Sequence, residues 1–150
     1  MKSKPLLQLG NFLPYRLSVL SNRISHDIAE SYREQFGLSQ REWRIMATIG
    51  EQPGLAARDV VRFTAMDKVA VSRAVNTMIK NKLVKRSFAD DDKRRSQLSL
   101  SEKGQAIYKE IVPLALGYEK AILDKLNKDE INTLDSMIKK LMDIQEHVND

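Results

Sequence analysis

Residues 67–104 read DKVAVSRAVNTMIKNKLVKRSFADDDKRRSQLSLSEKG. In the first part of this stretch, apolar residues recur every three or four positions, as on one side of a helix. This apolar stripe consists of Val71, Ala74, Val75, Met78 and Ile79. The opposite side carries groups that can donate to phosphates or base edges, with one exposed valine: Lys68, Val69, Ala70, Ser72, Arg73, Asn76, Thr77 and Lys80. The sequence therefore predicts an amphipathic helix with one apolar side and one polar side.

A β-hairpin is predicted directly after this helix, because the pattern changes to short alternation. The alternating apolar and long side chains are Val84, Arg86 and Phe88 in the first run, and Leu98 and Leu100 in the second. Between the runs, residues 90–95 read DDDKRR, which places a charged segment at the hairpin tip. A helix with a polar face followed by such a hairpin indicates a winged helix-turn-helix.

The run VSRAVNTMIKNKLVKR and the wing DKRRSQLSLSEKG resemble the MarR family of winged helix-turn-helix transcriptional regulators. The triplet Asp92-Lys93-Arg94 matches the family's Asp-x-Arg wing motif, which is the most specific part of the resemblance. The chain departs from the family at Lys82, where the family usually has glycine. A left-handed residue other than glycine costs roughly 1 kcal/mol. Either Asn81 takes the strained conformation or the turn differs.

The resemblance covers nearly the whole chain in layout and implies a mainly α fold with a small β-hairpin wing. It divides the chain into an N-terminal arm and dimerisation helix (1–36), a winged helix-turn-helix DNA-binding lobe (37–104) and C-terminal dimerisation helices (105–150). We therefore expect a cytoplasmic homodimer that regulates transcription, most often as a repressor.

Composition agrees with a single soluble domain carrying extensions. The chain has 150 residues and a net charge of +5. The stretch 53–104 holds 12 Lys and Arg against 6 Asp and Glu, so it carries +6 and the remainder −1. The positive charge thus lies in the part expected to face DNA. Cysteine is absent, and neither a signal peptide nor a membrane-spanning run is predicted.

Helix one is expected from about Phe12 to Gln35, with Asn11 as its N-cap, Pro14 in its first turn and Gly37 at its end. It has two apolar sides and therefore needs two partners, the core and a second subunit. One side is formed by Leu13, Leu17, Leu20, Ile24 and Ile28, and the other by Phe12, Tyr15 and Val19.

The remaining helices are predicted from their caps and apolar periods. Ser39 and Glu42 form a capping box that opens helix two, in which Trp43 is expected in the core. A short third helix is expected from Leu55 through Phe63, and Asp67 is a candidate N-cap of the recognition helix.

Two helices are expected after the hairpin. A long helix is expected from the Ser101–Gly104 turn toward Leu126, kinked or divided at Pro113, and Asn127 and Glu130 cap a final helix. That helix carries an apolar stripe of Ile131, Leu134, Ile138, Leu141 and Met142, which we expect to interlock with a second copy.

On the recognition helix, Arg73 and Asn76 have the chemistry to read guanine and adenine edges. Val69 suits contact with a thymine methyl group. Phosphate contacts, which set register without reading sequence, are expected from Lys68, Ser72, Thr77 and Lys80.

In the wing, the resemblance assigns Arg94 to the DNA minor groove, where narrow A·T tracts attract arginine. Asp92 is expected to pair with a neighbouring arginine and so fix the tip. Arg86 and Arg95 are candidates for that pairing or for phosphate contact.

Three other functional classes compete with a sequence-specific regulator. An enzyme is disfavoured, because His26 and His147 are the chain's two histidines and no phosphate-binding loop or metal-ligand spacing is present. No cofactor and no metal are predicted. An all-helical partner-binding module does not account for the basic stretch. An architectural DNA-binding protein without sequence preference stays open.

A ligand is implied by the resemblance, since MarR-like proteins often bind small aromatic acids or phenolic compounds. Arg16 lies on helix one beside Phe12, Tyr15 and Val19, and an arginine in an aromatic setting suits a carboxylate. A salt bridge between or within subunits is an equally good interpretation of Arg16.

Overall fold

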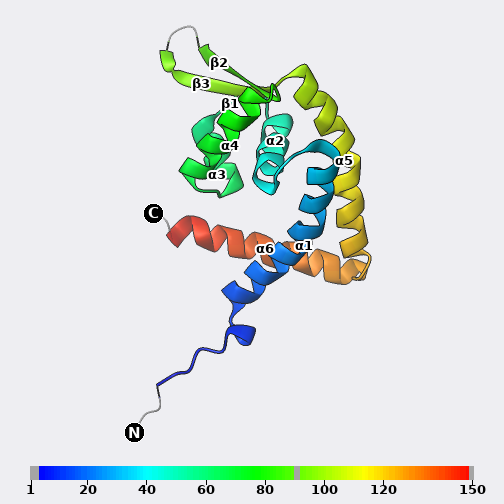
Figure 1. Cartoon of the computed structure of the whole chain (residues 1–150). Helices are drawn as coiled ribbons and strands as arrows, with labels where there is room; N and C mark the ends of the chain where they lie inside the picture. The colour runs from blue at the N-terminus through cyan, green and yellow to red at the C-terminus, as the bar shows by residue number, and fades with distance from the viewer. Residues whose placement is uncertain (1–3, 90–91, 149–150) are drawn as a thin grey trace. The chain divides into compact units, whose positions relative to one another are not determined.

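The computed structural model describes residues 4–89 and 92–148, and the side chains of residues 89, 92–95 and 144–148 lie outside the described part. It has a mainly helical fold with one small sheet, as the sequence predicts (Figure 1). In chain order the elements are η1 (Leu9–Asn11), α1 (Leu13–Phe36), α2 (Gln40–Glu51), β1 (Leu55–Ala56), α3 (Ala57–Thr64), α4 (Lys68–Lys80), β2 (Val84–Ala89), β3 (Asp92–Leu100), α5 (Glu102–Leu123) and α6 (Lys128–Val148). The chain divides into two compact units, Met1–Ile111 and Val112–Asp150.

The core of the first unit is built by α2, α3, α4 and the base of the β-hairpin. Figure 1 shows these helices gathered beside the hairpin, whose far end projects past them. The apolar stripe predicted for the recognition helix is confirmed, because its central members are buried. The fully buried side chains of this core are Ile45, Met46 and Ile49 of α2, Val60 of α3, Val71, Val75 and Met78 of α4, and Leu98 of β3. This packing fixes which face of α4 remains exposed.

The sheet has three strands in the order β1-β3-β2, all antiparallel. The prediction of a helix from Leu55 through Phe63 is therefore wrong at its start, because Leu55 and Ala56 form β1. Leu55 pairs with Leu98, and the N–H of Gly54 donates to the Leu98 carbonyl oxygen (2.9 Å). Backbone pairing with a strand more than forty residues away overrides the local helical pattern. The helix begins two residues later, at Ala57.

Three of the predicted helix caps are confirmed. The Ser39 hydroxyl accepts from the Glu42 N–H (3.2 Å), and the Asp67 carboxylate accepts from the Ala70 N–H (3.0 Å). The Asn127 side chain accepts from the Glu130 N–H (2.9 Å), and the Glu130 side chain accepts from the Asn127 N–H (3.0 Å). Caps of this kind are each worth about 1 kcal/mol, and the one at Asp67 sets where the recognition helix starts.

Helix α1 differs from expectation at its N-terminal end. Its N-cap is Phe12, which makes no side-chain cap bond, whereas Asn11 lies in η1 and donates to the Gln8 side chain (3.0 Å). Pro14 occupies the first turn, and Gly37 ends the helix in a left-handed conformation, both as predicted. The predicted apolar side formed by Leu13, Leu17, Leu20, Ile24 and Ile28 is half-buried only at Ile24 and Ile28, and its three leucines are exposed. Near the C-terminal end of α1, the buried Tyr32 packs against Trp43 of α2, with ring centroids 4.9 Å apart.

Helix α5 is anchored to the turn after α4 by its first residues. The Ser101 hydroxyl donates to the Lys82 carbonyl oxygen and accepts from the Gly104 N–H (3.0 Å), while the Ser101 N–H donates to the Leu83 carbonyl oxygen (3.0 Å). The helix continues through Pro113 rather than being divided there. The end of the recognition helix and the start of α5 are thus held in one hydrogen-bonded cluster.

The turn between α4 and β2 is strained at Lys82. This residue has φ 61°, whereas Asn81 has φ −81° and is the ordinary C-cap of α4. The left-handed conformation therefore falls at the position where the family usually has glycine, and not at Asn81. The surrounding bonds, including Leu83 N–H to the Met78 carbonyl oxygen (2.9 Å), hold the strained geometry.

We expect Lys82→Gly to stabilise the protein by about 1 kcal/mol, because glycine adopts positive φ without the steric cost that lysine meets. The free energy of unfolding in urea measures this. The matched control is Asn81→Gly, one residue earlier at negative φ, which we expect to be neutral or mildly destabilising. Equal destabilisation by both substitutions would contradict the account of the turn.

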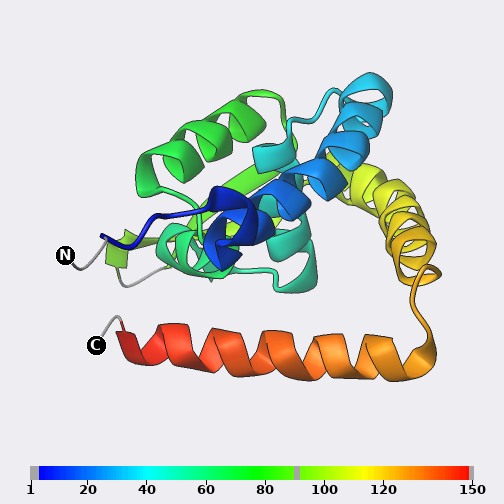
Figure 2. The same cartoon turned by 90° about the horizontal axis from the view of Figure 1, so that it is seen from below.

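The second unit comprises the end of α5 and the whole of α6, which Figure 2 draws as one unbroken helix. Its predicted apolar stripe is largely exposed, and includes Met137 beside the predicted residues. The exposed members are Leu134, Met137, Ile138, Leu141 and Met142. Within the described residues, no helix combines the length and apolarity that crossing a membrane would need.

Candidate nucleic-acid interface

Helix α4 presents one continuous polar face, because its opposite side is buried in the core. Every predicted DNA-contacting residue of this helix is exposed: Lys68, Val69, Ser72, Arg73, Asn76, Thr77 and Lys80. These positions follow the three-and-four spacing of a helix surface, so their side chains project from one side of α4. The burial of Val71, Val75 and Met78 is the physical cause of this orientation.

Basic side chains from three elements meet beside α4. A hollow of about 290 Å³ is lined by Arg58 of α3, Lys68 and Ser72 of α4, and Arg86 of β2, together with apolar side chains. Arg86 was predicted from the sequence as a phosphate-contact candidate, and the fold places it beside the recognition helix. Arg58 was not predicted, because its helix lacks a sequence motif that marks it.

The positive charge of this surface is not neutralised within the described side chains. The ion pairs found there join Lys120 to Asp124 and Lys139 to Asp135, and both lie outside this surface. The basic groups around α4 are therefore available to phosphates, whose binding releases condensed counterions. We name this surface, formed by Arg58, Lys68, Ser72, Arg73, Asn76, Thr77, Lys80 and Arg86, the basic face.

The Thr77 hydroxyl differs from the other polar groups of the basic face. It donates to the Arg73 carbonyl oxygen (3.0 Å) within α4. A hydroxyl has one proton to donate, so donation to a phosphate would require this bond to break. Contact between Thr77 and phosphate stays a prediction, and it would cost one exposed intrahelical hydrogen bond.

Two apolar side chains are exposed near the basic face. Val69 at the start of α4 is 54% exposed, as predicted, and Phe88 on β2 is 57% exposed. The alternation of Val84, Arg86 and Phe88 describes one side of β2, but only Val84 is buried. The hairpin extends beyond the helices that would cover its outer part.

Several residues that the sequence predicts to contact DNA lie at the hairpin tip. Residues 90 and 91 lie outside the described residues, and so do the side chains of Asp92, Arg94 and Arg95. The backbone from Asp92 belongs to β3, and the strand register shifts between Phe88 and Ala89. The pairing of Asp92 with an arginine and the minor-groove contact of Arg94 stay predictions.

Comparison with known proteins identifies this arrangement of helices and wing. Residues 36–95, which include α2, α3, α4 and β2, match the sequence profile of the MarR family. This part of the chain is similar to the MarR family. Its members are transcriptional regulators that bind DNA, and they are not enzymes.

Two curated relatives extend the similarity beyond the family profile. The transcriptional regulator HosA of Escherichia coli O157:H7 is 20% identical over 131 residues, which cover 82% of this chain and 97% of HosA. The HTH-type transcriptional regulator BilQ of Clostridium symbiosum is 25% identical over 93 residues, which cover 62% of this chain and 65% of BilQ. Both relatives are regulators of the class that the basic face suggests.

Solved structures of MarR-family proteins share the fold of this chain. A MarR/EmrR family regulator from Acinetobacter sp. ADP1 superposes with a TM-score of 0.87 at 24% identity, covering 94% of this chain and 99% of its own. A MarR-family protein from Listeria monocytogenes, solved with a 26mer DNA, gives 0.81 at 22% identity, with coverages of 89% and 87%. Bordetella bronchiseptica BpsR, solved in a study of regulation of DNA binding by 6-hydroxynicotinic acid, gives 0.80 at 20% identity, with coverages of 93% and 99%.

Ionisable groups elsewhere in this chain do not form a second chemical centre within the described residues. No cluster of His, Asp or Glu there could hold a metal ion. His26 is exposed on α1, and the side chain of His147 lies outside the described part. The pKa of Lys139 is raised by its hydrogen bond to Asp135 (2.8 Å), an exposed pair on the surface of α6.

The predicted ligand residues lie on the N-terminal half of α1. Phe12, Tyr15 and Arg16 are exposed, and Val19 is half-buried. Val19 borders an open hollow on α1 with Asn22, Arg23, His26 and Asp27. The four predicted residues therefore form a surface patch, which would need further side chains to enclose a ligand.

Proposed function

We propose that this chain represses transcription by binding a pseudo-palindromic operator as a homodimer, and that a small aromatic acid or phenolic ligand releases it. The observation that carries the proposal is the basic face, whose recognition helix exposes base-reading and phosphate-binding side chains together. One recognition helix would enter the major groove of each half-site, with half-site centres about one helical turn apart.

Base reading is assigned to Arg73 and Asn76, which project from the exposed side of α4. Arginine can donate twice to guanine, and asparagine can bond twice to adenine. Val69 would contact a thymine methyl group, which accounts for an exposed valine on a polar surface. The remaining basic groups would bind phosphates and set the register of the helix in the groove.

The homodimer is supported by exposed apolar side chains on both terminal parts of the chain. On α1 they include Leu13, Leu17 and Leu20, and on α6 they include Ile138 and Met142. Contiguous apolar surfaces of this kind are uncommon on monomers and mark contact sites. A two-fold symmetric pair would cover both surfaces and present two recognition helices.

Light scattering is expected to give a mass near twice the 17.2 kDa of one chain at micromolar concentration. Leu17→Glu combined with Leu20→Glu would place charge in the covered surface and shift the mass toward one chain. The control pair is Arg41→Glu with Glu51→Lys, two exposed positions of α2 that lie outside both apolar sides of α1. A single-chain mass for the unmodified protein would refute the dimer.

Release by a small aromatic acid is proposed at the patch of Arg16, Phe12, Tyr15 and Val19. The similarity to BpsR supports this class of ligand, since the structure of that protein concerns control of DNA binding by 6-hydroxynicotinic acid. The Arg16 guanidinium would bind the carboxylate, and the aromatic side chains would contact the ring. A second copy covering α1 would supply the missing walls.

Calorimetric titration with salicylate-type acids is expected to show binding to the wild type and a loss of roughly tenfold in affinity for Arg16→Ala. Operator DNA must weaken ligand binding by the factor with which the ligand weakens DNA binding, because coupling between sites is reciprocal. Equal ligand affinity in both proteins would make Arg16 a structural residue.

A further inference from the structure

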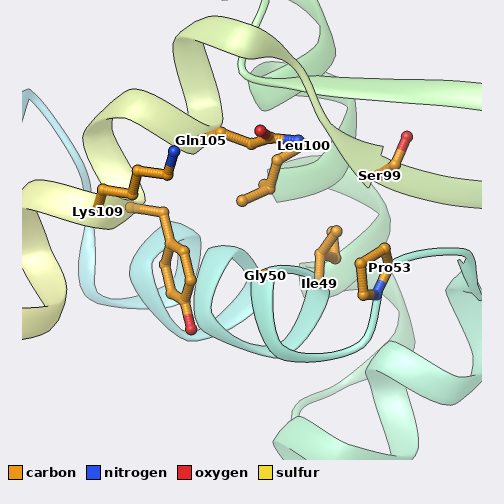
Figure 3. Close-up of a pocket in the computed structure, with 8 residues that line it drawn as sticks. Ile49, Gly50, Pro53, Ser99, Leu100, Gln105 and Lys109 are labelled. Atoms are coloured by element: carbon orange, nitrogen blue, oxygen red, sulfur yellow. The ribbon is translucent and has the colours of Figure 1, made fainter.

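Phe88, in the outer part of β2, is an aromatic side chain that the fold leaves uncovered. Its ring is 57% exposed, whereas Leu100 at the hairpin base is 6% exposed. Figure 3 shows Leu100 with Ile49 of α2 and Gln105 of α5 around it. An isolated apolar side chain on a protein surface is common. The surroundings of the Phe88 ring therefore decide what it can contact.

The ring projects from the same side of β2 as Arg86. Successive side chains of a strand point to opposite faces, so Val84, Arg86 and Phe88 share one face. Val84 is buried in the core, and Arg86 lines the hollow of about 290 Å³ together with Lys68 of α4. This face of the hairpin is therefore turned toward α4, and Phe88 continues a row that begins in the core and passes through the basic face.

The residue paired with Phe88 is too small to cover its ring. Phe88 pairs with Ser96 of β3, and the register shifts directly afterwards, between Phe88 and Ala89. An irregularity of this kind bends a strand and changes the direction of the side chains beside it. Ser96 borders a polar hollow with Arg58 and Asp59 of α3. The groups that border this part of the hairpin are thus polar.

DNA bound to the basic face would reach the Phe88 ring. Two residues of a strand span about 6.6 Å, so the Cα atom of Phe88 lies about that far beyond Arg86 toward the hairpin tip. The Arg86 guanidinium suits a phosphate, and the DNA backbone presents the carbons of a deoxyribose on either side of each phosphate. The ring is therefore placed one step along the backbone from a phosphate contact, where the backbone is apolar.

A DNA backbone matches this position better than a second copy of the chain does. The exposed apolar side chains proposed to meet a second copy lie on α1 and α6, apart from β2. Arg58, Lys68 and Arg86 carry positive charge close to the ring. These groups attract phosphates, whereas a two-fold contact centred on Phe88 would bring like charges together.

We propose that the Phe88 ring packs against a deoxyribose of the DNA strand whose phosphate binds Arg86, and that this contact supplies affinity that does not depend on salt. The inference rests on the proposed DNA-binding function and deepens it. Phosphate contacts release condensed counterions, so they weaken as the salt concentration rises. Removing an aromatic ring from water releases no ions, so its contribution stays nearly constant.

The test measures binding of the full chain to a labelled duplex, selected from a random library with the wild type, over a series of salt concentrations. We expect Phe88→Ala to lower affinity roughly tenfold at every salt concentration, with an unchanged slope of log affinity against log salt. Phe88→Leu keeps an apolar side chain and should recover most of the affinity. Lys68→Ala should instead reduce the slope by about 1, because it removes a phosphate contact.

Phe63→Ala is the matched control, because Phe63 is also an exposed phenylalanine (51%) and lies on α3 outside the basic face. It should leave both affinity and slope unchanged. The free energy of unfolding of Phe88→Ala in urea should equal that of the wild type, since the ring is not part of the core. Phe88→Leu separates loss of the apolar contact from any change in folding.

The proposal is overturned if Phe88→Ala binds as the wild type does, if it changes the salt slope, or if Phe63→Ala weakens binding equally. A change in the mass of Phe88→Ala by light scattering would assign the ring to contact with a second copy, and would also overturn it. A wild type that binds no duplex at low salt overturns the proposed function together with this contact, so that failure is distinguishable from a failure at Phe88 alone.

Discussion

Gly104→Ala is expected to lower the free energy of unfolding by about 2–3 kcal/mol, the cost of forcing an extra carbon into a packed site. A Cβ atom at residue 104 would lie 2.1 Å from the Leu83 carbonyl oxygen, which is backbone and cannot rotate away. Moving it would break the bond from the Ser101 N–H (3.0 Å), and with it the link between α5 and the recognition helix. Urea unfolding followed by circular dichroism measures the loss.

Gly117→Ala is the control, because it lies in the same helix with nothing within 4 Å of the added carbon. It should stabilise the protein by about 1 kcal/mol through helix propensity alone. If both alanine variants were stabilised, the close approach of α5 to the turn after α4 would be contradicted.

Arg73→Ala is expected to reduce operator affinity by about 1–3 kcal/mol and to relax preference at one base position in each half-site. The reason is that Arg73 lies on the exposed side of α4, where its guanidinium can bond twice to one base. Competition binding with a panel of operators changed at single positions measures both effects. Arg33→Ala, on α1, removes the same charge outside the basic face and should leave base preference unchanged.

Arg94→Ala is expected to weaken DNA binding in a different way from Arg73→Ala. If the wing arginine enters the minor groove, its loss lowers affinity mainly where the flanking sequence is rich in A·T pairs, because those grooves are narrow and strongly negative. The same operator panel with altered flanks separates the two variants. Identical profiles for both would refute the assignment of distinct roles.

The sequence was sufficient to predict the recognition helix, because a helical stripe must be buried and its opposite side must then be exposed. The burial of Val75 and the exposure of Asn76 both follow from that one fact. The N-cap at Asp67 could also be predicted from the sequence, since it depends on residues only three positions apart. Such local patterns also carry the resemblance to the family.

Features that depend on distant pairing were not predictable in this way. β1 forms because Leu55 meets Leu98 across the sheet, and no pattern within residues 55–63 indicates that partner. The space lined by Ile49, Leu100 and Tyr108 joins residues from α2, β3 and α5, which are far apart in the sequence. Arg58 joins the basic face for the same reason. Glycine at residue 50 is the one local signal, and its meaning depends on where Tyr108 packs.

The central claim, that α4 reads DNA sequence once in each half of a symmetric operator, is tested most directly by footprinting on duplexes selected from a random library. We predict an inverted repeat with half-site centres about one helical turn apart, two protected major-groove segments, and binding that weakens steeply with salt. Uniform protection with no inverted repeat in the selected pool would contradict the claim and favour an architectural DNA-binding protein.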